Sequence, residues 1–204
     1  MWNDIMKKSE SFMISVPVKE HMFRIKEHNI AMIKEDVEFM VLYTILVENE
    51  RLYLFTFLEP QLVAAILGRI PDDRARDLAK RLGEIIPGQL LMAALNDGKE
   101  MRHWMFLLID LSKEIVYFFD PLRGYIPEVC KNVVGIAFQL HNLTKGKKMK
   151  QDSLQWYNVK CPQQQDFKTC SFYVCAMMRD LVFEPQPSSY IKSKCNNQQF
   201  YSKD

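Results

Sequence analysis

Residues 104–119 read WMFLLIDLSKEIVYFF, which is the clearest structural signal in the chain. Two apolar runs, 104–109 and 115–119, flank the short polar stretch 110–114. Two runs of this kind around a polar turn are typical of a β-hairpin. Neither run alternates apolar with polar residues, which indicates strands that are covered on both faces. The stretch therefore predicts a central sheet with helices packed around it.

Outward from this hairpin, apolar periodicity and breaks at Pro and Gly predict the remaining elements. The predicted strands are 52–58, 89–95 and 154–159, and the predicted helices are 33–47, 61–70, 71–86, 127–142 and 170–183. Together these elements predict an α+β fold, formed by one domain over residues 30–186. We expect residues 1–30 to be a lead-in segment, or the start of a piece of a longer protein. We expect residues 187–204 to be a polar, poorly ordered tail.

The composition excludes several classes of protein. At roughly 150 residues per domain, a chain of 204 residues fits one domain. Lys and Arg number 27 against 25 Asp and Glu, and the formal net charge of +2 excludes a protein built as a polycation for nucleic acid. An apolar content of 48% excludes a largely disordered chain. Five cysteines are too few for a disulfide scaffold, and an odd number cannot all pair. The cysteine content therefore favours free thiols in a reducing compartment.

The sequence contains no targeting or membrane signal. Residues 1–20 contain no apolar run as long as a signal-peptide core. No uncharged apolar stretch reaches the ~18 residues of a membrane span. The lysine-rich run 145–150 fits a solvated loop better than a nuclear address. We therefore expect a nuclear or cytoplasmic protein with no membrane and no nucleic-acid partner.

Two ionisable residues flank the predicted hairpin. His103 comes directly before the first strand, and Asp120 comes directly after the second. In a hairpin the start of one strand lies beside the end of its partner, so we expect both side chains at the same end of the sheet. Pro121 favours an extended backbone at Asp120. A histidine beside a carboxylate is an oriented general base, which makes this pair a candidate for catalysis.

A candidate nucleophile opens the last predicted helix. Cys170 follows the loop 161–169, so we expect its thiol at a helix N-terminus, where unpaired N–H groups and the helix dipole stabilise a thiolate. An adjacent imidazolium would stabilise it further. The backbone N–H of Cys170 and the side-chain amide of Gln164 are candidate donors for an oxyanion hole. Taken singly, His103 also fits a surface or packing residue, Cys170 a small buried apolar side chain and Asp120 a turn former.

Four motifs carry a resemblance to a known family. They are His103-Trp104, Phe119-Asp120-Pro121-Leu122, Cys161-Pro162-Gln163-Gln164 and Cys170-Ser171-Phe172-Tyr173-Val174-Cys175. In order and spacing they resemble the SUMO/ubiquitin-like-protein cysteine protease family. Phe-Leu-Glu-Pro at 57–60 and the hairpin resemble the plant, often transposon-associated, branch of that family. The resemblance covers residues 30–184, which is most of the chain.

The resemblance implies a papain-like cysteine protease fold with a permuted His-Asp-Cys order. It implies that Cys170 attacks the carbonyl carbon of a C-terminal glycine, that His103 moves the proton and that Asp120 orients the imidazole. Gln164 would donate to the oxyanion, and Trp104 would line a narrow channel for a Gly-Gly tail; the alternative for Trp104 is a core residue at the start of a strand. The implied partner is a ubiquitin-like modifier or its conjugates. No cofactor is implied, and the oligomeric state stays open.

The chain also departs from the pattern of this family. Ser171 stands where the family usually has Gly after the nucleophile, and Thr169 and Asp166 stand in place of its usual Asp and Asn. Phe167 replaces the glycine of an Asn-Gly turn, and Trp2-Asn3-Asp4 is only a faint echo of an early Trp-Leu-x-Asp motif. These departures keep open a catalytically weak or inactive module that binds a ubiquitin-like protein. A third hypothesis, an acyltransferase with the same triad, lacks a basic cluster for coenzyme A.

The other cysteines have structural interpretations. Cys161 and Cys175 match family positions that are structural, Cys130 lies on a predicted helix and Cys195 lies in the tail. The chain has no C-x-x-C pair, and the remaining histidines lack the spacing of metal ligands. We therefore expect no metal site.

Overall fold

The computed structural model of the chain describes residues 14–18, 28–32, 50–51, 53–58, 71–96, 103–147, 154–164 and 170–195. The chain forms two compact units, Met1–Leu52 and Tyr53–Asp204. In the first unit, β1 (Ile14–Val18) pairs antiparallel with β2 (His28–Met32). The weak periodicity of residues 1–30 gives no sign of this hairpin, because each strand is short and its partner lies beyond a long connection. The second unit begins later than the predicted domain, whose limits stay a prediction.

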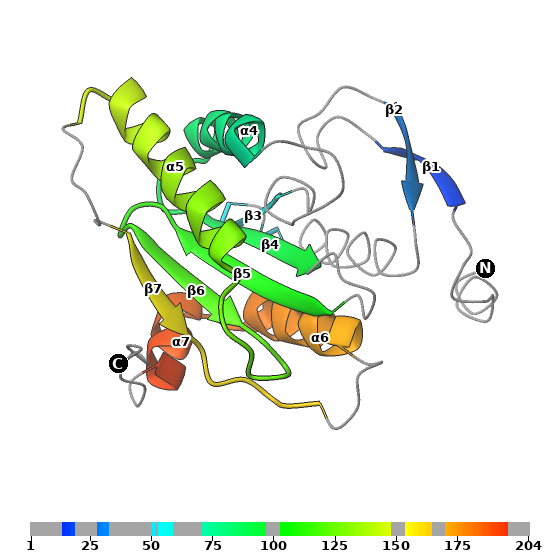
Figure 1. The fold of residues 1–204 in the computed structure, drawn as a ribbon. Helices are drawn as coiled ribbons and strands as arrows, with labels where there is room; N and C mark the ends of the chain where they lie inside the picture. The colour runs from blue at the N-terminus through cyan, green and yellow to red at the C-terminus, as the bar shows by residue number, and fades with distance from the viewer. Residues whose placement is uncertain are drawn as a thin grey trace. The chain divides into compact units, whose positions relative to one another are not determined.

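The second unit is built on a five-stranded sheet (Figure 1). Its strands in spatial order are β3 (Phe55–Leu58), β4 (Leu90–Asn96), β5 (Trp104–Asp110), β6 (Ile115–Phe119) and β7 (Gln155–Asn158). The central strands β4, β5 and β6 are antiparallel, while β3 pairs parallel with β4 and β7 pairs parallel with β6. The predicted hairpin is confirmed, with Phe106 opposite Phe119 and Asp110 opposite Ile115.

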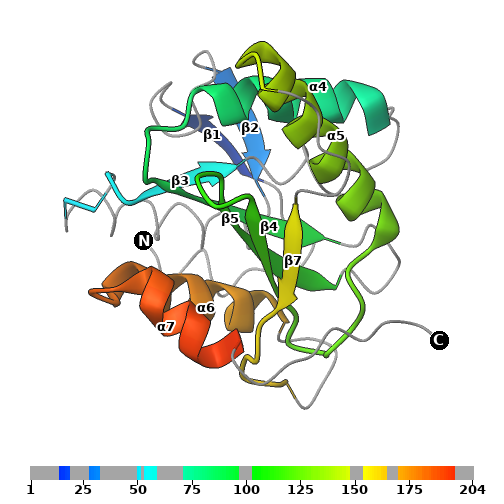
Figure 2. The same ribbon diagram turned by 90° about the vertical axis from the view of Figure 1, so that its left-hand side faces the viewer.

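Helices cover both faces of this sheet (Figure 2). On one face lie α4 (Pro71–Gly83) and α5 (Glu128–Thr144), and on the other lie α6 (Cys170–Phe183) and α7 (Pro187–Cys195). All seven residues of β5 are buried, as the apolar run without alternation predicts. The structure therefore confirms the α+β fold with a covered central sheet.

The main core lies between the sheet and the pair α4 and α5. Alternate residues of β5 enter it, because successive side chains of a strand point to opposite faces. The core residues are Leu58, Ala75, Leu78, Leu82, Leu91, Ala93, Leu95, Met105, Leu107, Ile109, Val116, Phe118, Cys130, Val133, Val134, Ala137 and Phe138. None of the helices in the described ranges is long and apolar enough to cross a membrane.

The structure differs from the prediction most clearly at the end of α4 and in the C-terminal tail. Helix α4 ends at Gly83 rather than at 86, because the chain turns there toward β4, with Gly88 at a φ of 88°. The expectation of a poorly ordered tail is wrong for Pro187–Cys195, which form α7. Ile191 of α7 is fully buried, so packing holds this helix in place although most of its residues are polar. The predicted helices 33–47 and 61–70 lie outside the described residues.

Phe118 tests the packing of the hairpin against the main core. Its side chain is 1% exposed, so Phe118→Ala is expected to lower the free energy of unfolding by about 3–5 kcal/mol. The control is Phe183→Ala at the half-exposed end of α6, expected to change it by no more than about 0.5 kcal/mol. Urea denaturation of both variants measures the difference. Equal losses for the two would contradict this assignment of the core.

Candidate active site

The hairpin brings His103 and Asp120 together, as the sequence predicts. Since Phe106 and Phe119 are direct partners, the residues just beyond the paired segment lie at the same end of β5 and β6. His103 Nε2 lies 2.6 Å from Asp120 Oδ1. The side chains are 14% and 4% exposed, so water competes little for this contact. A buried pair this short fixes the orientation of the imidazole ring.

Backbone N–H groups hold the Asp120 carboxylate from the side of the following turn. The N–H of Leu122 donates to Oδ1 at 2.8 Å, and the N–H of Gly124 donates to Oδ2 at 2.6 Å. Burial alone raises the pKa of Asp120, but the hydrogen bonds and the charge of His103 outweigh it and hold that pKa below its ordinary value. The carboxylate is therefore charged at neutral pH, although it is buried.

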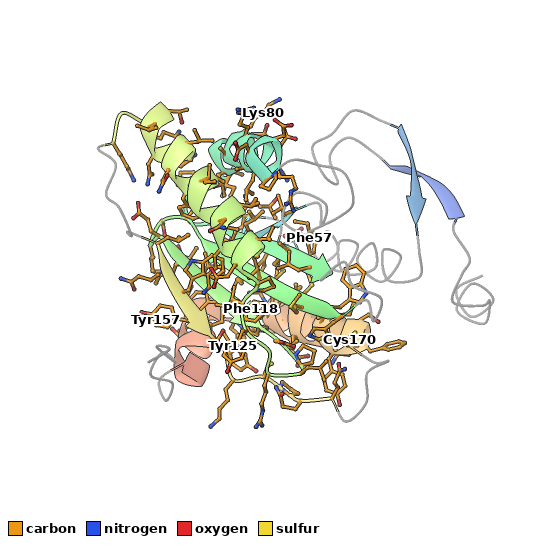
Figure 3. The ribbon with its side chains drawn as sticks, in the orientation of Figure 1. Phe57, Lys80, Phe118, Tyr125, Tyr157 and Cys170 are labelled. Atoms are coloured by element: carbon orange, nitrogen blue, oxygen red, sulfur yellow. The ribbon has the colours of Figure 1, made fainter. Side chains whose placement is uncertain are left out.

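Cys170 joins this pair from the helix that packs against β5. It is the first residue of α6, as predicted, and α6 packs against β5 (Figure 3). The backbone N–H of Trp104 donates to Cys170 Sγ at 3.4 Å. His103 also interacts with the thiol and lowers its pKa. His103 thus lies between Asp120 and Cys170, with Nε2 toward the carboxylate.

The electrostatics of the three groups favour an ion pair. Burial alone lowers the pKa of His103, but the hydrogen bonds and charges of Asp120 and Cys170 outweigh it and raise that pKa to about 9. Burial alone raises the pKa of the Cys170 thiol, whereas the hydrogen bond and charge of His103 and the N–H of Trp104 bring it below its ordinary value. The arrangement therefore supports a thiolate beside an imidazolium at neutral pH.

Cys170 differs in this respect from two other cysteines. Burial raises the pKa of Cys130 to about 12 and the pKa of Cys161 to about 11. Cys130, Cys161, Cys170 and Cys175 are free thiols. No group of His, Cys, Asp and Glu within the described ranges is arranged to hold a metal ion. Among the described thiols with a shifted pKa, Cys170 is the one prepared for nucleophilic attack.

The other predicted site residues lie nearby. Gln164 is buried, and its backbone N–H donates to the carbonyl of Pro121 at 3.0 Å, which ties its loop to the turn after Asp120. Trp104 is buried, and its backbone N–H donates the hydrogen bond to Cys170 Sγ. The roles of Gln164 in an oxyanion hole and of Trp104 in a substrate channel stay predictions. Of the departures from the family, Ser171 is buried, and residues 165–169 and 2–4 lie outside the described residues.

The backbone of Asp120 is fixed by contacts that no sequence motif indicates. Its carbonyl accepts hydrogen bonds from Cys161 Sγ and from Gln163 Nε2, both at 3.3 Å. Gln163 Nε2 also donates to the carbonyl of Cys161 at 3.0 Å. The Cys-Pro-Gln-Gln motif contains these residues, but only the fold reveals that they meet a turn some 40 positions earlier, since the separations are 41 and 43.

Comparison with known proteins shows which family and which folds this chain resembles. Residues 87–204 match the Ulp1 protease family, C-terminal catalytic domain. The fold is similar to that of a de-sumoylating protease, with a TM-score of 0.61, 9% identity and coverage of 92% of this chain and 85% of that chain. It is also similar to Xanthomonas campestris effector protein XopD bound to ubiquitin, with a TM-score of 0.52, 19% identity and coverage of 83% and 84%. None of the curated proteins matches this chain. The expected papain-like cysteine protease fold is confirmed.

The ion pair predicts a selective reaction of Cys170 with iodoacetamide. Because its pKa is lowered, Cys170 is expected to be alkylated at neutral pH while Cys161 stays unmodified. His103→Ala removes the cation and is expected to move the alkylation midpoint up toward the ordinary ~8.5 of a thiol. Peptide mass spectrometry across a pH series measures both midpoints. Coincident midpoints for Cys170 and Cys161 would contradict the ion pair.

Proposed function

Because this chain belongs to the Ulp1 protease family and is a cysteine protease of the deSUMOylating type, we propose that it cleaves the bond after the C-terminal Gly-Gly of a ubiquitin-like modifier. The observation that carries the proposal is that His103 lies 2.6 Å from Asp120 while the N–H of the next residue, Trp104, donates to Cys170 Sγ. The directions of the pKa shifts at Cys170 and His103 agree with this geometry. A thiolate poised beside an imidazolium is the reactive form of a cysteine protease. Asp120, Gln164 and Trp104 complete the proposed machinery.

The first half of the proposed reaction forms a thioester. The Cys170 thiolate attacks the carbonyl carbon of the terminal glycine, and the carbonyl electron pair moves onto the oxygen. When this tetrahedral intermediate collapses, the C–N bond breaks and the His103 imidazolium gives its proton to the leaving amine. The leaving group is the side-chain amine of a lysine in a conjugate, or the amine of the next residue in a precursor.

The second half of the reaction releases the modifier. His103, now neutral, takes a proton from water, and the resulting hydroxide attacks the thioester carbonyl. The C–S bond then breaks, and Cys170 leaves as the thiolate beside the imidazolium, which restores the starting state. No redox cofactor enters this balance. Asp120 stabilises the imidazolium in both halves and keeps its ring oriented.

Gln164 and Trp104 have supporting roles in the proposal. The Gln164 amide donates a hydrogen bond to the oxyanion of both tetrahedral intermediates. Such a hydrogen bond stabilises the transition state most strongly in a buried site that excludes water. Support for this role comes from its burial and from the hydrogen bond that ties its loop to Pro121. The flat Trp104 ring admits glycines and rejects larger side chains beside Cys170.

The proposed partner is a ubiquitin-like protein or its conjugates. Its chemical class follows from the family, and XopD, whose fold this chain shares, is described in a complex with ubiquitin. A nuclear or cytoplasmic location belongs to the same proposal, because a low-pKa thiol is readily oxidised outside a reducing compartment.

Modifier probes test the proposal directly. A panel of ubiquitin-like proteins, each with an electrophile at its C-terminus, is expected to give a covalent adduct on Cys170 with at least one member. Cys170→Ala should give none, while Cys175→Ala, a change at a thiol on the same helix, should react like the parent. Intact mass spectrometry reads the result. A parent that forms no adduct with any modifier contradicts the proposal; binding without adduct or turnover would establish the inactive binding module instead.

Substitutions at the site are expected to rank by chemical role. Cys170→Ser should abolish turnover, His103→Ala should nearly do so, and Asp120→Asn should lower kcat by about 10⁴-fold, as in other triads. Gln164→Ala should lower kcat by about 10²–10³-fold if its amide binds the oxyanion. Gln155→Ala, at an exposed position on β7, is the control and should turn over normally. Unaltered turnover of Gln164→Ala would assign this residue to loop structure alone.

A further inference from the structure

The turn after Asp120 contains a glycine whose missing side chain leaves room for the carboxylate. Gly124 donates its N–H to Asp120 Oδ2 at 2.6 Å. A Cβ atom built on Gly124 would lie 2.5 Å from Oδ2 and 3.7 Å from Cγ of the same carboxylate. Carbon and oxygen atoms that are not bonded do not approach to 2.5 Å, so any other residue at this position requires the carboxylate or the turn to move.

Backbone conformation does not account for this glycine. The residue with a left-handed backbone in the turn is Arg123, with a φ of 56°. Gly124 itself has no φ in that region, so an L-amino acid fits its backbone without strain. What Gly124 supplies is therefore space beside Asp120.

The backbone of Asp120 is held too firmly to retreat from an added Cβ. Its carbonyl accepts the hydrogen bonds of Cys161 and Gln163 at 3.3 Å, and that of the Arg123 N–H at 3.1 Å. The next carbonyl, that of Pro121, accepts the N–H of Gln164. The carboxylate is thus the part that can move, by rotation about its side-chain bonds.

Rotation of the carboxylate would disrupt its pairing with His103. Oδ1 lies between His103 Nε2 and the N–H of Leu122, and the two oxygens turn together as one rigid group. Asp120, Arg123, Gly124 and Tyr125 also line a hollow of about 440 Å³, which gives the displaced carboxylate a place to turn into. We expect the protein to keep its fold while the carboxylate leaves its place.

We propose that Gly124 is a positioning residue of the active site, whose missing side chain keeps the Asp120 carboxylate paired with His103. The inference rests on the proposed function, in which Asp120 orients the imidazole. Gly124 touches neither the substrate nor the reacting atoms and acts through Asp120 alone. Gly135, inside α5, offers a matched comparison, because a Cβ there would have nothing within 4 Å.

The first measurement needs no substrate. In a Cys170→Ala background, which leaves the His103–Asp120 pair alone, the titration of His103 is followed by NMR with and without Gly124→Ala. Loss of the paired carboxylate is expected to lower the His103 pKa by about one unit or more. Gly135→Ala should leave the titration unchanged. An unchanged titration in a folded Gly124→Ala protein overturns the inference, even if the parent turns over no modifier.

The kinetic measurement uses the modifier that the probe panel identifies. Gly124→Ala in the otherwise unaltered chain is expected to lower kcat by about 10²-fold or more with KM nearly unchanged, since a displaced catalytic group costs rate rather than binding. Adding Asp120→Asn should then cost little more, because both changes disrupt the same pair. Fully additive losses would overturn the inference, whereas absence of turnover in the parent counts against the proposed function.

A stability measurement covers the case in which Gly124→Ala folds poorly. Asp120→Ala removes the atoms that the new Cβ would meet. Gly124→Ala should therefore lower the thermal midpoint in the parent and have little effect in the Asp120→Ala background. A loss of the same size in both backgrounds shows that the carboxylate is not what the Cβ displaces, and overturns the inference.

Discussion

The hydrogen bond between His103 and Asp120 depends on one constraint, the register of the β5–β6 hairpin. His103 and Asp120 lie just beyond paired strands, so they meet at 2.6 Å only if Phe106 faces Phe119. A slip of one residue would turn one of them to the other face of the sheet. The fully buried β5 prevents such a slip, because it would exchange the side chains that pack on the two helical layers. Core packing therefore fixes the geometry of the site.

The charges of the three groups stabilise one another through this geometry. Backbone N–H groups keep the buried Asp120 carboxylate ionised, and the ionised carboxylate favours a protonated His103. The imidazolium in turn stabilises the Cys170 thiolate, together with the N–H of Trp104. Each group would shift the opposite way by burial alone. The reactive state therefore comes from close, oriented contacts that outweigh desolvation at every step.

Much of the fold could be predicted from local signals. The hairpin, the covered sheet, α5 and the start of α6 at Cys170 agree with the sequence, because apolar runs and Pro or Gly breaks are strong there. Local signals fail for α7, where few apolar residues mark the helix, and for β1 and β2, whose strands are only five residues long. The burial of Ile191 depends on a surface formed by distant parts of the chain. The limits of the domain and the plant branch of the family stay predictions.

The sequence by itself determined which chemical groups are available and where along the chain they stand. It placed His103 before the first strand and Asp120 after the second strand of one hairpin, and Cys170 at the start of a helix, since strand pairing and helix ends are local events. Only the tertiary structure decided that Cys170 meets Trp104 across a separation of 66 positions, and that Gln163 reaches back to Asp120. It also placed Gly124 so close to the Asp120 carboxylate that a Cβ atom would not fit between them. The reason is physical: distances, burial and the resulting pKa values depend on how remote segments pack, which local sequence patterns do not encode.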